Sequence, residues 1–146
     1  MYANEIILAE DDPTDATFFK RALNRLDDPP RLAWYQSGTE VLAALRERQQ
    51  KDELPRLAIL DIKMPGMNGI ELLHAIKANP EFAHLPVLIM SSSDEKRDIK
   101  SAYAAGANGY LVKPNRFQDL RQLVRSIHQF WLRTNRLRPP SFQAEA

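Results

Sequence analysis

The chain has 146 residues, the length of one domain, and 44% of them are hydrophobic, which is enough for a single sizeable core. Lysine and arginine together number 20 and aspartate and glutamate 19, so the formal charge of +1 favours neither nucleic acid nor an anionic membrane as a partner. There is no cysteine, which excludes disulfides, thiolate metal sites and cysteine nucleophiles.

The N-terminal region carries acidic residues, Glu5 and Glu10 among them, around only a short apolar run. We therefore expect no signal peptide. No apolar run in the sequence is long enough to span a bilayer. These features predict a cytoplasmic protein without membrane contact.

Five apolar runs of strand length alternate with five segments of helical periodicity. The apolar runs predict strands at residues 6–9, 32–35, 57–60, 86–90 and 109–112. The helical patterns lie within residues 13–26, 39–45, 70–76, 95–105 and 117–131. This alternation predicts βαβ units and an α/β fold with a parallel sheet covered on both faces. Five such units favour a doubly wound sheet of order 2-1-3-4-5, with a crevice between the first and third strands.

Polar side chains stand where these strands end. Glu10 and Asp11 follow the first strand, Asp61 the third, Ser91 the fourth and Lys113 the fifth. Because the carboxyl ends of parallel strands share one edge of the sheet, we expect these five groups to converge. Each residue alone also has an ordinary structural interpretation, as a turn acid, a helix cap or a surface lysine. Their joint placement favours a functional site.

Three carboxylates at one edge repel one another, and a hard divalent cation would relieve that repulsion. Mg²⁺ fits best, because it prefers oxygen ligands and is commonly held by one or two carboxylates beside a phosphate. A zinc site is not favoured, since the three histidines lie away from the strand ends and no CxxC or HExxH pattern is present.

A carboxylate beside Mg²⁺, a lysine and a hydroxyl can accept a phosphoryl group. Asp61 would attack phosphorus in line and become an acyl phosphate. Lys113 and the metal would neutralise charge on the equatorial oxygens, and Ser91 would donate a hydrogen bond to one of them.

Four motifs occur in the chain in this order: Glu10-Asp11, Asp61 followed by Met64-Pro65-Gly66-Met67-Asn68-Gly69, Ser91-Ser92, and Lys113-Pro114. In their order, these motifs closely resemble the receiver domain of two-component response regulators, of the CheY-like type. The resemblance covers about residues 5–131 and implies a flavodoxin-like (βα)5 fold. It implies that Asp61 is the phosphoacceptor and that Mg²⁺ is held by Glu10 (through water), Asp11, Asp61 and the main-chain carbonyl of Lys63.

The same resemblance implies that Ser91, Ser92 and Lys113 contact the phosphoryl group. It further implies that Ser91 and Tyr110 form a switch that repacks the surface of helix 4, strand 5 and helix 5. By the same resemblance, we expect the Lys113–Pro114 bond to be cis.

Two positions depart from the family pattern. The first acid is Glu10, where many receivers have aspartate, and its longer reach should still serve a water-mediated role. Lys63 stands two residues after the phosphoacceptor, where a polar acceptor could position attacking water. Since a lysine there cannot accept a proton, we expect a long-lived aspartyl phosphate.

We assign residues 1–131 to the receiver and residues 132–146 to a C-terminal tail, which is too short for a helix-turn-helix effector. The sequence thus predicts a stand-alone receiver that does not bind nucleic acid, despite the arginines of the tail. One helix cannot bury all three of Phe130, Trp131 and Leu132. We expect at least one to be exposed and the group to mark an interface.

This apolar triplet and the loop at residues 79–86 also resemble single-domain regulators that are paired with bacterial and cyanobacterial phytochrome kinases. That narrower resemblance implies a sensor histidine kinase of the phytochrome type as the phosphoryl donor. It also implies a homodimer through the face from helix 4 to helix 5. Two alternatives stay open. One is a phosphatase or phosphotransferase of the haloacid dehalogenase type that acts on a small substrate, although Lys63 stands where such enzymes have a second carboxylate. The other is a pseudo-receiver that acts as an interaction module without phosphorylation. We do not expect the protein to catalyse any reaction other than its own phosphorylation and dephosphorylation.

Overall fold

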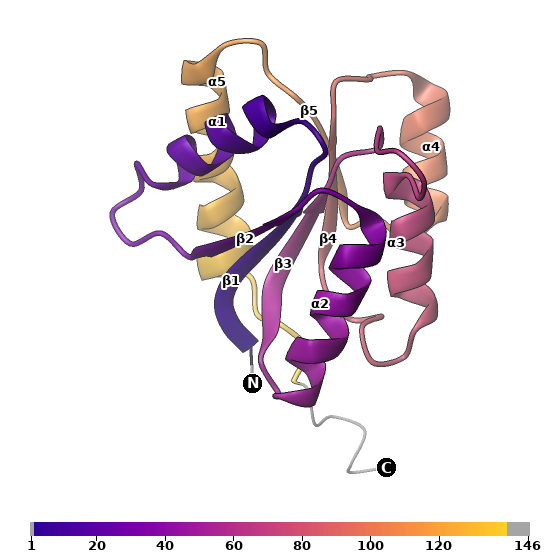
Figure 1. Cartoon of the computed structure of the whole chain (residues 1–146). Helices are drawn as coiled ribbons and strands as arrows, with labels where there is room; N and C mark the ends of the chain where they lie inside the picture. The colour runs from indigo at the N-terminus through magenta and orange to yellow at the C-terminus, as the bar shows by residue number, and fades with distance from the viewer. Residues whose placement is uncertain (1, 140–146) are drawn as a thin grey trace.

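The computed structural model describes residues 2–139, which form a parallel five-stranded sheet between two layers of helices (Figure 1). The sheet order is β2-β1-β3-β4-β5. The strands are β1 (Tyr2–Ala9), β2 (Arg31–Tyr35), β3 (Leu54–Leu60), β4 (Val87–Ser91) and β5 (Gly109–Val112). The helices are α1 (Pro13–Leu23), α2 (Gly38–Gln50), α3 (Gly69–Ala78), α4 (Lys96–Ala104), α5 (Phe117–Ile127) and the π-helical turn η1 (His128–Thr134). The predicted fold class and strand order are confirmed.

Two apolar cores lie on opposite faces of the sheet. On one face, α2, α3 and α4 cover a core that includes Leu45, Leu72 and Ala102. On the other face, α1, α5 and η1 cover a core that includes Phe19 and Ile127. Figure 1 shows the two helix layers on either side of the sheet. The central strands β1, β3 and β4 face both cores, which explains their nearly continuous apolar sequences.

Local sequence signals explain where two helices next to the strand ends begin. Asp12 caps α1, because its carboxylate accepts a hydrogen bond from the Thr14 N–H at 2.9 Å, and Pro13 suits the first helical position. Asn68 and Glu71 form a reciprocal capping box at the start of α3. Both helices therefore start within a few residues of a strand end.

The strands differ from the prediction at their amino ends. β1 begins at Tyr2 and β3 at Leu54, because these residues pair with each other across the sheet. The pairing shifts register between Ala3 and Ile6. Hydrogen bonding between strands thus extends both strands beyond their apolar runs, and the sequence pattern alone does not report it.

A buried carboxylate links β1 to its neighbours. Glu5 is 1% exposed and contacts the Arg48 side chain of α2 at 2.6 Å and the Arg31 side chain of β2 at 3.1 Å. Burial alone would raise the pKa of Glu5, but the hydrogen bonds and charges of Arg48 and Arg31 outweigh it and lower the pKa. This carboxylate therefore has a structural role away from the strand ends.

The C-terminal half of the chain differs from the sequence-based expectation at the Lys113–Pro114 bond and at the end of the last helical segment. The Lys113–Pro114 bond is trans, so the cis expectation is wrong; the trans form is the intrinsically favoured one, by about 0.5–1 kcal/mol for a bond before proline. Helical backbone continues past Trp131 to Thr134 as the π-helical turn η1. Within residues 2–139 no helix is both long enough and apolar enough to cross a membrane.

Candidate functional site: an acidic cluster with a buried lysine

The acidic cluster forms where β1 and β3 end side by side. Ala9 pairs with Leu60, and the Asp61 N–H donates to the Ala9 carbonyl at 3.0 Å. The residues that follow each strand are therefore neighbours. Carboxylate oxygens of Glu10, Asp11 and Asp61 all lie within 4.8 Å of one another. Glu10 is 4% exposed and Asp61 is 7% exposed. Three acids predicted to converge are thus brought together.

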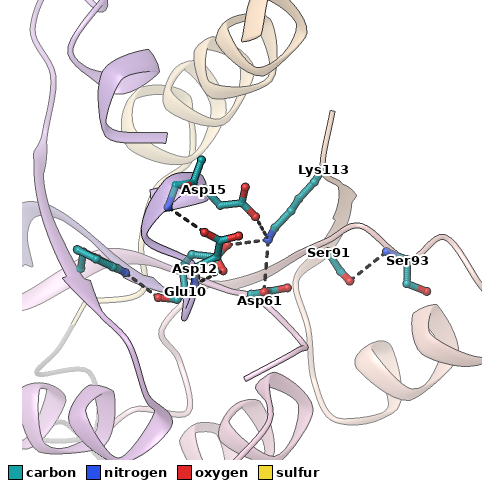
Figure 2. A network of polar contacts seen from close by, with 9 residues as sticks. Glu10, Asp12, Asp15, Asp61, Ser91, Ser93 and Lys113 are labelled. Atoms are coloured by element: carbon teal, nitrogen blue, oxygen red, sulfur yellow. Dashed lines mark hydrogen bonds and ion pairs between the residues drawn. The ribbon is translucent and has the colours of Figure 1, made fainter. Parts of the chain in front are cut away.

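Lys113 reaches this cluster from the end of β5, as Figure 2 shows. Its Nζ lies 2.7 Å from Glu10 Oε1 and 3.3 Å from Asp61 Oδ2. Its main-chain N–H donates to the Ser91 carbonyl at 2.8 Å, which fixes the backbone of Lys113 against β4. The ammonium thereby partly offsets the repulsion among the carboxylates.

The ionisation of Glu10 is strongly affected by this environment. Burial raises the pKa of Glu10 to about 7, and the charge of Asp61 adds to the shift. The hydrogen bonds from Lys113 and from the Asp12 N–H act in the opposite direction. Burial also disfavours the charge on Lys113, but the carboxylates of Glu10 and Asp15 outweigh it and hold the pKa of Lys113 above its usual range. The ammonium therefore remains charged at neutral pH.

Ser91 is fully buried at the end of β4, and Figure 2 shows it on the side of Asp61 away from Glu10. Its Oγ accepts a hydrogen bond from the Ser93 N–H at 3.2 Å. Tyr110, which is partly buried against the core under α4, donates its hydroxyl to the Ser93 carbonyl at 2.8 Å. The two residues predicted as a switch are thus joined through one residue of the β4–α4 loop. Ser92 is exposed beside them.

The β3–α3 loop turns back tightly over the end of β3. The Gly69 N–H donates to the Ile62 carbonyl at 2.9 Å. A Cβ at position 69 would overlap the main-chain carbonyl of Asp61, so only glycine allows this close approach. Lys63 lies within the loop with its side chain exposed.

Comparison with known proteins agrees with this geometry. The sequence pattern named "Response regulator receiver domain" matches residues 6–125. The chain belongs to this family. Receiver domains are signalling modules of phosphorylation-based pathways, and the acidic cluster of this receiver has the oxygen donors that suit a divalent cation.

Similar proteins include regulators from archaea and cyanobacteria. This receiver is 34% identical over 137 residues to the probable methanogenesis regulatory protein FilR2 of Methanothrix harundinacea, covering 93% of this chain and 88% of that one. It is 30% identical over 131 residues to the response regulator Rcp1 of Synechocystis, covering 88% and 89%. The phosphorylated cyanobacterial phytochrome response regulator RcpA superposes with a TM-score of 0.85 at 31% identity, covering 94% of this chain and 99% of that one.

Two residues of this receiver contact the site but were not predicted from the sequence. Asp15, in the first turn of α1, places its Oδ2 2.9 Å from the Lys113 Nζ. Trp34, on β2, donates its indole N–H to the Glu10 carbonyl at 2.7 Å. An acid in the first turn of the helix that follows the Glu10–Asp11 pair is a signal that could have pointed to Asp15. No comparable signal marks Trp34.

The apolar triplet lies on η1 and not among the strand-end residues. Phe130 is 48% exposed, Trp131 is partly buried and Leu132 is 8% exposed within the core under α1 and α5. The expectation that at least one of the three stays exposed is confirmed. The Phe130 and Trp131 rings pack edge to face with their centroids 5.0 Å apart.

Proposed function

We propose that this receiver accepts a phosphoryl group on Asp61 from a sensor histidine kinase and acts as a response regulator. One observation carries the proposal: Asp61 is a buried carboxylate at the carboxyl end of β3, within 4.8 Å of the Glu10 and Asp11 carboxylates and 3.3 Å from the Lys113 ammonium. A carboxylate held beside two further acids and a lysine suits attack on a phosphoryl group better than a structural role.

The transfer uses the residues at the strand ends. An Asp61 carboxylate oxygen forms a bond to phosphorus while the P–N bond of the donor phosphohistidine breaks, and the imidazole leaves. Lys113 offsets the charge on the phosphoryl oxygens, and Ser91 donates a hydrogen bond to one of them. Asp11, Asp61 and the Lys63 carbonyl are the ligands that we propose for Mg²⁺, with Glu10 acting through water. When bound, Mg²⁺ supplies further neutralisation of the phosphoryl charge. Ser92 is a further candidate contact from the β4–α4 loop.

The response to phosphorylation would pass through the β4–α4 loop. Ser93 links Ser91 to Tyr110 through its main-chain N–H and carbonyl. A movement of Ser91 toward a phosphoryl group would therefore change the position of Tyr110, and with it the surface of α4, β5 and α5. Phosphorylation shifts this equilibrium only as far as it binds one conformer better than the other.

A phytochrome-type kinase is the donor that we propose. The support is similarity: the cyanobacterial phytochrome response regulator RcpA aligns with 94% of this chain at 31% identity, and the response regulator Rcp1 aligns with 88% of it at 30% identity. The Mn²⁺-bound form of Rcp1, with a TM-score of 0.80, supports a divalent metal at the acidic cluster. We further propose that Phe130 and Trp131 contribute to a homodimer interface, since Phe130 is exposed beside Trp131. Leu132 was also expected in this interface, but it is buried in the core under α1 and α5.

The test is exposure of the protein to acetyl phosphate and Mg²⁺, followed by intact mass measurement. Wild type should gain one phosphoryl group and Asp61→Asn should gain none. Asp119→Asn, an exposed aspartate in the first turn of α5, is the matched control and should behave as wild type. No gain in wild type would contradict the proposal and favour the pseudo-receiver alternative.

A further inference from the structure

Asp15 differs from the other acids around Lys113. It comes from α1 and not from a strand end, and it lies outside the cluster of Glu10, Asp11 and Asp61. Its carboxylate is nevertheless 2.9 Å from the Lys113 ammonium, closer than the carboxylate of Asp61 at 3.3 Å. Figure 2 shows the Lys113 ammonium joined by dashed lines to Asp15, Glu10 and Asp61.

The ammonium of Lys113 therefore has a full set of anionic partners. A lysine carries three N–H donors. Glu10, Asp15 and Asp61 all lie within 3.3 Å of the Nζ of Lys113. Two of these donors form hydrogen bonds to Glu10 and Asp15, whereas Asp61 lies at ion-pair distance, 3.3 Å from the Nζ. A phosphoryl group on Asp61 would place more negative charge on that side of the ammonium, so its oxygens would compete with Glu10 and Asp15 for the three donors.

Asp15 is the partner that gives up the contact at least cost. The Glu10 side chain is 5% exposed, whereas the Asp15 side chain is 42% exposed. Water can solvate the Asp15 carboxylate after the ion pair separates, but a buried Glu10 carboxylate would be left without compensation. Asp15 is thus the exchangeable partner.

The surroundings leave room for the lysine to move. A cavity of about 160 Å³ lies between α1 and α5 and is bordered by Asp15 and Lys113. Its other lining includes Phe18 and Phe117, whose rings are 6.1 Å apart between centroids. The lysine stem can therefore change position without displacing a closely packed neighbour.

We propose that Asp15 is a positioning residue that competes with the phosphorylated Asp61 for the Lys113 ammonium and thereby weakens binding of the phosphoryl group. This inference rests on the proposed function of Asp61. It also assigns α1 a role in the exchange: the ion pair links α1 to the segment after β5, and phosphorylation separates the two.

The test is the affinity for beryllofluoride, a phosphoryl mimic, measured by titration calorimetry at saturating Mg²⁺. Asp15→Asn should bind about fivefold more tightly than wild type, the size expected for loss of one partly exposed ion pair. Asp15→Glu, which keeps the charge, should restore an affinity close to wild type. Asp119→Asn removes the same charge from the same helical position of α5 and should leave the affinity unchanged.

A double-mutant cycle separates competition for the lysine from direct repulsion by Asp15. In a Lys113→Met background, Asp15→Asn should have no further effect. Unchanged or weaker binding by Asp15→Asn alone would overturn the inference, as would a fivefold gain that persists without Lys113. Failure of wild type itself to bind would instead contradict the proposed function, and the inference with it.

Discussion

At the scale of single residues, Lys63 is the position that we expect to affect the rate of dephosphorylation. Its side chain is exposed in the β3–α3 loop, two residues after Asp61. A protonated ammonium can donate hydrogen bonds but cannot accept one from a water molecule. The residue therefore cannot orient water for attack on an aspartyl phosphate by accepting its proton.

Replacing this lysine should shorten the lifetime of the phosphorylated protein. We expect Lys63→Asn to speed dephosphorylation by about tenfold, because the amide oxygen can accept a hydrogen bond from attacking water; the effect should be smaller than that of a full general base. The measurement is loss of the phosphoryl mass with time after acetyl phosphate is removed. Lys20→Asn, at an exposed position on α1, is the control. Equal lifetimes for Lys63→Asn and wild type would end this hypothesis.

At the scale of elements, η1 separates the roles of adjacent apolar residues. The π-helical turn buries Leu132 in the core under α1 and α5 while it leaves Phe130 48% exposed. A helical turn with one more residue than an α-helix changes which side chains face inward. The segment thus both closes the core and presents an aromatic side chain to solvent.

Alanine substitutions should distinguish these two roles. Leu132→Ala should lower the free energy of unfolding by about 2–3 kcal/mol, because it removes buried side-chain volume. Phe130→Ala should cost less than about 1 kcal/mol, since half of the side chain is already exposed.

If Phe130 lies in a homodimer interface, its loss should shift the protein toward monomer in light scattering. An unchanged oligomeric state would remove Phe130 from the proposed interface.

At the scale of the whole molecule, ionisation of the acidic cluster lowers the free energy of unfolding. Glu10 is buried and the pKa of Glu10 is raised to about 7. A carboxyl group with a raised pKa stabilises the fold in its neutral form. That contribution is fully present below the pKa of the unfolded chain and is lost as pH rises through about 7.

Mg²⁺ should therefore stabilise the protein most at pH values where Glu10 is ionised. At a concentration about 100 times its Kd, a ligand of the folded state adds about 2.7 kcal/mol to the free energy of unfolding. For a chain of this size, we expect Tm at pH 8 to rise by about 6–10 °C. Without metal, Tm should fall between pH 5 and pH 8.

Two variants control the measurement. Glu10→Gln should remove most of the fall in Tm between pH 5 and pH 8 in the metal-free protein, because the amide does not titrate. Asp11→Asn should reduce the rise that Mg²⁺ produces. A rise of equal size in Asp11→Asn and wild type would show that the ion stabilises the fold from elsewhere.

The sequence by itself determined the sheet order and the group of strand-end residues. Apolar runs that alternate with helical patterns allow few topologies, and the carboxyl ends of parallel strands must share an edge. Asp61, Glu10 and Lys113 could therefore be placed together before any coordinates were known. Spacing could not reveal that β1 begins at Tyr2, because that boundary depends on pairing with β3.

Only the tertiary structure decided which side chains surround the lysine. Asp15 and Lys113 are 98 positions apart, and their contact depends on how the first turn of α1 meets the segment after β5. The inward side of Leu132 likewise depends on a π-helical turn that the apolar pattern does not encode. Periodicity reports which face of an element is apolar, whereas contacts between distant side chains follow from the packing of whole elements.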